Sequence, residues 1–220
     1  MKREPRPCTA EESCARAELL IGIEAAAATP HPYILSAGRY NPARPEALPF
    51  SPGVSEDAVR RQGTKLGCDC SAFIKWCAQL PSLRPNFNKG AWATVTGSIN
   101  VDSLIEDGQH EHDLVQVVTS GPPLPGDLLA WPSVRGREIG KTGSASSRRF
   151  RVGHISLVLR VRAAEWDWTR PSFELLDVGQ CGSRHTPAVH RSTGAAWNGQ
   201  HRFQGRTRAS WASVVLRFVR

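Results

Sequence analysis

Residues 66–80 read LGCDCSAFIKWCAQL, and Pro81 follows directly. Apolar side chains recur in this stretch at the three- and four-residue spacing of one helix face, as at Phe73, Cys77 and Leu80. A proline cannot continue a helix, because it lacks the backbone N–H and clashes with the preceding turn. The pattern therefore predicts an amphipathic helix within residues 66–81 that packs on a core.

Cys70 falls in the first turn of this helix. The N-terminus of a helix carries a partial positive charge and unpaired N–H groups, which favour a thiolate and lower a cysteine pKa to as little as ~3.5–7.5. The same N–H groups can hold the oxyanion that forms when a carbonyl is attacked. The sequence therefore predicts that Cys70 is a nucleophile with a lowered pKa, whereas Cys77, two turns later, is a core residue.

A cysteine nucleophile needs a base, and His154 is the one histidine inside a strongly apolar run, VGHISLVL over residues 152–159. A position on a strand would hold its imidazole in a fixed orientation. The six other histidines lie in polar or loop contexts, where surface positions are expected: His31, His110, His112, His185, His190 and His201.

The remaining chain divides into a helical first part and a β-rich second part. Thr9 and Glu12 form a capping-box pattern that opens a helix within residues 1–30. A short helix near 101–107 and a strand near 114–118 follow. Residues 124–219 hold short β-rich runs at 127–131, 152–161, 173–181 and 211–219, separated by loops. Helices first and strands later predict a single α+β domain over residues 1–220.

Three segments together resemble the NlpC-type cell-wall peptidase family in composition, order and spacing. They are LGCDCSAFI at 66–74, LPGDLL at 124–129 and GHISLV at 153–158, and the likeness extends roughly from Tyr33 to Val189. The resemblance implies a papain-like fold, in which a helix that carries the nucleophile packs against an antiparallel sheet.

The resemblance also implies roles for individual residues. Cys70 matches the family's nucleophile and His154 its base, and Tyr33 matches a tyrosine that borders the site. Asp69 and Ser71 flank the nucleophile and are expected to bind substrate. The family has a third polar residue on the strand after the histidine, which orients the imidazole. Gln180 and Asp177 compete for that role, and the alignment favours Gln180.

Two departures from the family pattern stand beside the nucleophile. Ala72 stands where the family usually has Gly, a small steric change. Cys68 lies two residues before Cys70, so a metal site or a redox pair is the rival interpretation of this segment. Residues two apart diverge on a helix, and no second pair at metal-ligand spacing completes a site. We expect most of the six cysteines to be free thiols, and we expect no metal and no cofactor.

Charge is uneven along the chain. The formal net charge is +8, and residues 132–220 hold 16 Lys and Arg against 5 Asp and Glu. Such a basic part suits anionic partners, among them the acidic polymers of a bacterial envelope. Nucleic acid is the weaker expectation, because no zinc-finger spacing, basic heptad helix or base-stacking motif is found.

The resemblance implies a cysteine hydrolase that cleaves amide bonds in the stem peptide of peptidoglycan through an acyl-enzyme on Cys70. Glu11, Glu12, Glu18 and Glu24 interrupt the apolar run near the N-terminus, so we predict neither a signal peptide nor a membrane span. A protein made in the cytoplasm would then reach the wall by lysis, in a phage particle or through a secretion system.

Two rival functions stay open: a catalytically altered or inactive relative with another acyl substrate, and a basic module that binds nucleic acid or a protein partner.

Overall fold

The computed structural model describes residues 6–27, 33, 44, 46–50, 68–80, 99–132, 153–162, 175–182, 188–194 and 213–219. In these ranges, six strands form one sheet in the order β1-β6-β2-β3-β4-β5, and each neighbouring pair is antiparallel. The strands are β1 (Val115–Val117), β2 (Leu128–Trp131), β3 (His154–Val161), β4 (Leu176–Cys181), β5 (Val189–Thr193) and β6 (Val214–Phe218).

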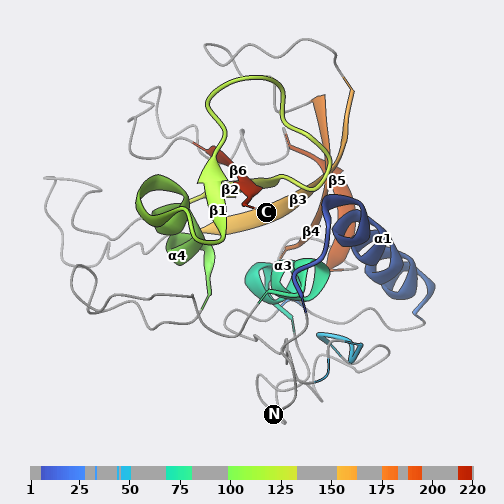
Figure 1. The fold of residues 1–220 in the computed structure, drawn as a ribbon. Helices are drawn as coiled ribbons and strands as arrows, with labels where there is room; N and C mark the ends of the chain where they lie inside the picture. Colours follow the sequence, from blue (N-terminus) through green and yellow to red (C-terminus); the bar gives the residue numbers. More distant parts are fainter. Residues whose placement is uncertain are drawn as a thin grey trace, which may run out of the picture.

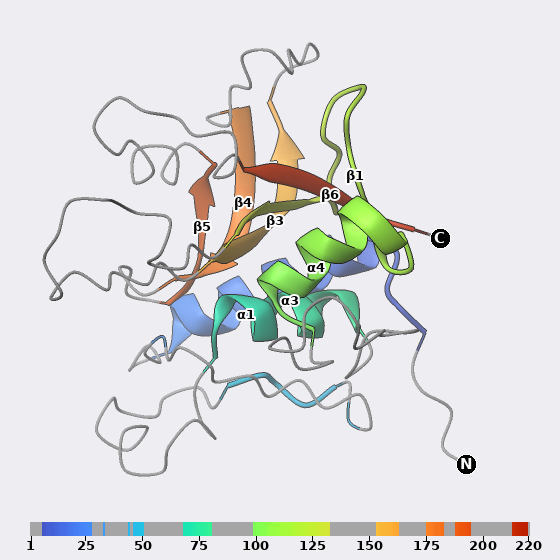
Figure 2. The same cartoon turned by 90° about the vertical axis from the view of Figure 1, so that its left-hand side faces the viewer.

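Helices lie on one side of this sheet (Figure 1, Figure 2). They are α1 (Ala10–Ala26), α3 (Cys70–Ala78) and α4 (Val101–Glu106), which continues into the π-helical turn η2 (Asp107–Glu111). The predicted α+β class is therefore confirmed. Among the described residues, no helix is long and apolar enough to cross a membrane.

The main core lies between the sheet and helices α1 and α3. Phe73 of α3 and Leu157 of β3 are fully buried in it. Gly179 of β4 faces the helices, and a Cβ atom there would lie 3.4 Å from the side chains of Ile21 and Phe73. The glycine therefore lets both helices approach β4 closely. Arg16 of α1 links the helices, since its guanidinium stacks 3.7 Å from the Trp76 ring centre.

The opposite face of the sheet carries a second, smaller cluster of buried side chains. Alternation along each strand separates the two faces, because successive side chains point to opposite sides. The members of the second cluster are Val118, Leu129, Trp131, Val158, Leu176, Val178 and Val215. Residues in phase with these side chains lie on the face away from α1 and α3.

The predicted helices and five of the six strands are confirmed, with ends shifted by up to three residues. Thr9 and Glu12 form the predicted capping box of α1. The strand β5 was not predicted, because its sequence VHRST is short and mostly polar. Residues 31–54, where the many Pro, Gly and Asn residues predict an irregular loop, lie mostly outside the described residues, as do residues 133–150, a predicted basic loop.

Candidate active site

The helix α3 begins where the sequence predicts, and Asp69 is its N-cap. The Asp69 carboxylate oxygen Oδ1 accepts hydrogen bonds from the Ala72 N–H at 2.8 Å and from the Ser71 hydroxyl at 2.7 Å. An acidic cap satisfies otherwise unpaired N–H groups and favours the helix start. Asp69 and Ser71, predicted to bind substrate, thus bond to each other within the cap.

Cys70 is the first residue of α3, and only 4% of its surface is exposed. Two donors reach its sulfur, the backbone N–H of Ile155 and the hydroxyl of Tyr33. Tyr33 is held nearby by a parallel bridge to Cys68. The register of β3 with β4 begins at Leu157↔Gly179, so Ile155 lies beyond the part of β3 that pairs with β4, although it pairs with Ala130 of β2. The thiol therefore lies where these two strands separate.

Burial sets the protonation of this thiol. Loss of water, and secondarily the negative charge of Asp69, raise the pKa of Cys70 from its ordinary 9.0 to about 12, against the smaller opposing effect of the Ile155 and Tyr33 donors. The prediction of a lowered pKa is therefore wrong for the structure described. A helix N-terminus alone does not favour a thiolate when the sulfur is out of water and beside a carboxylate.

His154 and Gln180 are brought together from neighbouring strands. Nε2 of His154 lies 3.1 Å from Oε1 of Gln180, and both side chains are buried. His154 is the first residue of β3 and stands opposite Trp131, with the two ring centres 5.4 Å apart. The imidazole is therefore held between an aromatic ring and an amide.

Asp177, the other candidate for the third position, lies elsewhere. Its carboxylate forms an ion pair with Arg162 at 3.1 Å, and its cross-strand partners are Arg160 and Thr193. It stands three residues before Gln180 on β4, so alternation puts the two side chains on opposite faces of the sheet. Of the two candidates, Gln180 is the one in contact with His154.

The amide of Gln180 also contacts β5. Its Nε2 lies 3.1 Å from Nε2 of His190 and 2.6 Å from the hydroxyl of Ser192. His190, which was expected at the surface, is half-buried on a strand, whereas His110 and His112 are exposed as expected. Polar residues at 190 and 192 are two positions apart, which is the repeat of one strand face. This alternation is the sequence pattern that could have indicated the position of His190.

Cys70 lies on the side of the sheet that α3 covers, whereas the side chain of His154 lies on the other face. His154 is in phase with Trp131, on the face away from α3, whereas Ile155 belongs to the core beneath α3. Among the groups that act on the thiol are the Ile155 N–H and the Tyr33 hydroxyl. The thiol therefore lies next to the backbone of the residue that follows His154.

Other thiols surround the nucleophile helix. The Cys181 sulfur lies 3.5 Å from the Cys68 carbonyl oxygen, and burial raises the pKa of Cys181. All six cysteines are free thiols, and Cys77 is buried in the core as predicted. In the described ranges, no group of three or more His, Cys, Asp or Glu side chains could hold a metal ion.

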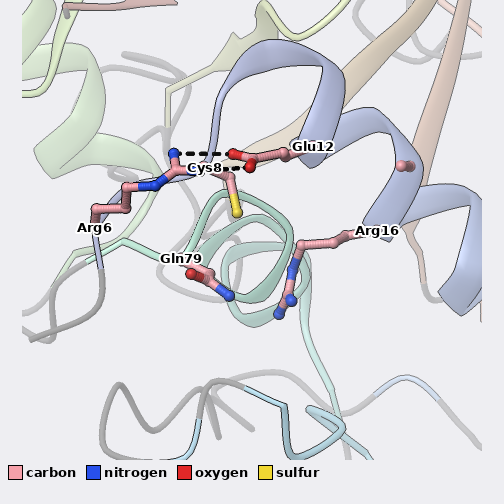
Figure 3. Close-up of a pocket in the computed structure, with 6 residues that line it drawn as sticks. Arg6, Cys8, Glu12, Arg16 and Gln79 are labelled. Carbon is pink, nitrogen blue, oxygen red and sulfur yellow. Dashed lines mark hydrogen bonds and ion pairs between the residues drawn. The ribbon is translucent and has the colours of Figure 1, made fainter.

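A pocket of about 320 Å³ lies at the other end of α3 (Figure 3). It is lined by Arg6, Cys8, Glu12, Ala15, Arg16 and Gln79. Gln79 caps the C-terminus of α3, whereas Cys70 begins the helix, so about 13 Å of helix separates the pocket from the nucleophile. Arg6 and Glu12 pair with each other in it at 2.6 Å. This pocket does not belong to the Cys70 site.

No protein-family model matches the sequence, and no curated protein or solved structure is significantly similar to it.

Proposed function

We propose that the protein is a cysteine hydrolase with a papain-like fold that cleaves amide bonds. The observation that carries this proposal is the hydrogen bond of His154 to Gln180, formed on strands that border the thiol of Cys70. A cysteine at a helix start, a histidine on a strand and a polar residue that orients the histidine are the three parts of such a site.

Within that class, we propose an NlpC-type peptidase that acts on the stem peptide of peptidoglycan. The resemblance rests on three segments in family order, and two of them overlap β2 and β3 of the sheet. We propose that the protein is made in the cytoplasm and acts on the wall after delivery by lysis, a phage particle or a secretion system. An anionic wall polymer is a further proposed partner of the basic C-terminal part.

The mechanism begins with the neutral thiol of Cys70, which lies beside the strand that carries His154. Because Nε2 of His154 donates its hydrogen to Gln180, Nδ1 carries the lone pair and accepts the thiol proton. Sulfur attacks the amide carbonyl carbon and forms a C–S bond. The imidazolium then protonates the leaving nitrogen as the C–N bond breaks, and water hydrolyses the acyl-enzyme with His154 again as base.

The oxyanion of this reaction needs donors from the helix start. The N–H groups of Ala72 and Phe73 bond to the side chain and the carbonyl oxygen of Asp69. A helix begins with four N–H groups that lack a partner within the helix. Within α3, the N–H groups of Cys70 and Ser71 precede these, and we assign oxyanion binding to them.

The test is digestion of purified peptidoglycan under reducing conditions, with mass spectrometry of the released fragments. We expect release by the wild type and loss of release in Cys70→Ala and His154→Ala. Cys77→Ala is the matched control, since it removes a buried thiol from the same helix but away from His154, and it should keep activity. Equal release by Cys70→Ala would refute the proposal.

A second candidate is a relative that binds acyl substrates without cleaving them. The observation that favours it is the raised pKa of the Cys70 thiol, which burial keeps neutral. In this case the wild type sediments with insoluble peptidoglycan and releases no fragments. Soluble fragments that depend on Cys70 would exclude this candidate.

A further inference from the structure

The amide of Gln180 has one orientation that satisfies its neighbours. Its nitrogen Nε2 carries two hydrogens, and two groups lie within hydrogen-bond distance of it, Nε2 of His190 at 3.1 Å and Oγ of Ser192 at 2.6 Å. Its oxygen lies 3.1 Å from His154. Whether this orientation is fixed depends on whether both β5 groups are acceptors.

His190 is an acceptor at Nε2. Its other ring nitrogen, Nδ1, lies 2.9 Å from the carbonyl oxygen of Ala188. A carbonyl oxygen only accepts, so Nδ1 must carry the hydrogen, and in the neutral ring Nε2 then holds the lone pair. His190 therefore accepts a hydrogen bond from the amide of Gln180.

Ser192 is an acceptor as well. Its hydroxyl donates its single hydrogen to the carbonyl oxygen of Thr193 at 3.3 Å. The oxygen Oγ then has lone pairs toward Gln180 and accepts the second amide hydrogen at 2.6 Å. His190 thus requires the NH₂ of Gln180, and Ser192 accepts the other amide hydrogen, which leaves the amide oxygen to His154.

We infer that His190, together with Ser192, is a positioning residue that sets the tautomer of His154 by fixing the amide of Gln180. This inference rests on the proposed function, since it assigns Nδ1 of His154 as the base. If the amide turned over, its NH₂ would face Nε2 of His154. That nitrogen would then have to accept, the hydrogen would move to Nδ1, and the neutral imidazole could no longer take the thiol proton.

The experiment is ¹⁵N NMR of the histidine ring nitrogens near pH 8.5, with His154→Gln used to assign the His154 signals. The variants are His190→Gln, which keeps an acceptor, His190→Leu, Ser192→Ala, and the double variant His190→Leu/Ser192→Ala. The readout is the tautomer of His154. It needs no turnover, so it is independent of whether peptidoglycan is the substrate.

In the wild type and in His190→Gln, we expect the Nε2–H tautomer of His154 to exceed the other at least about tenfold, because a turned amide would set its oxygen against the acceptor at position 190. In the double variant the Nδ1–H fraction should rise to roughly a third or more, since neither acceptor remains. His190→Leu and Ser192→Ala each keep one acceptor, and they show whether the two contribute separately.

Two results would overturn the inference. One is an Nδ1–H tautomer of His154 in the wild type. The other is an unchanged tautomer in a double variant whose amide spectrum shows a folded protein. If the double variant does not fold, the two single variants decide. The inference is contradicted when the His154 tautomer is unchanged in both single variants and the wild-type tautomer ratio is below tenfold.

Discussion

At the scale of single residues, the nucleophile differs from the thiolate that a helix start favours. Cys70 is 4% exposed and lies beside Asp69, and burial first and that charge second raise its pKa to about 12. The thiol is therefore neutral at ordinary pH. A neutral thiol must lose its proton during attack, so the proposed chemistry depends on the imidazole of His154 more than it would with a preformed thiolate.

Alkylation of Cys70 by iodoacetamide tests this protonation state. Only the thiolate reacts, and a pKa of about 12 in place of 9.0 lowers the thiolate fraction at pH 8 on the order of a thousandfold. Peptide mapping should show a rate at Cys70 that rises about tenfold per pH unit from pH 6 to 10. A plateau below pH 9 would mean that a thiolate is already formed, against this account.

The same pKa makes stability depend on pH at the alkaline end. The folded value of about 12 lies above the ordinary 9.0, so folding favours the protonated thiol. The stability that this preference contributes is fully present below pH 9 and is lost as the pH rises from 9 through 12. Replacement of Cys70 by Ala should therefore flatten the alkaline decline of the free energy of unfolding.

At the scale of elements, the cap of α3 has two effects that oppose each other for catalysis. Asp69 stabilises the helix start through the Ala72 N–H and the Ser71 hydroxyl. Its charge also raises the pKa of the thiol next to it. The geometry of the nucleophile and its reactivity are thus set by the same carboxylate.

Two substitutions of Asp69 separate these effects. Asp69→Asn keeps an oxygen for the Ala72 N–H but removes the charge, so urea unfolding should change little while alkylation of Cys70 at pH 8 becomes faster. Asp69→Ala removes the cap and should lower the free energy of unfolding by about 1 kcal/mol. Slower alkylation in Asp69→Asn would contradict the assigned effect of the charge.

Elements with a strong apolar period could be predicted from the sequence, and the polar ones could not. The helix from Cys70 and the strand from His154 follow from their spacing, as does the cap at Thr9. The strand β5 has no such pattern, so the position of His190 beside Gln180 was missed. The pKa of Cys70 depends on the burial of its sulfur and on Tyr33, which lies far away in sequence.

At the scale of the whole molecule, a tight contact joins α1 to the sheet. Gly126 has φ +92°, and a Cβ atom there would lie 2.4 Å from the Cβ of Ala10. The next residue, buried Asp127, accepts hydrogen bonds from Nε and Nη2 of Arg217 at 2.8 and 2.7 Å, which ties the start of β2 to β6. The helices and the sheet are thus fixed to each other at this corner.

Gly126→Ala should destabilise the fold by roughly 3 kcal/mol or more, because strain at positive φ adds to a clash with the backbone and side chain of Ala10. Gly121→Ala is the matched control. Its φ is +69° and nothing lies within 4 Å of the added Cβ, so only the strain of about 1–2 kcal/mol should appear. Equal losses in chemical denaturation would contradict the contact described.

The central claim is that Cys70 becomes acylated during amide cleavage. The most direct measurement is rapid acid quenching of the protein during digestion of a stem-peptide substrate, followed by intact-mass analysis and tandem mass spectrometry. The account predicts an added mass equal to the acyl part of the substrate, located on Cys70 and absent from Cys70→Ala. Cleavage that continues in Cys70→Ala, or an acyl group found on another residue, would contradict it.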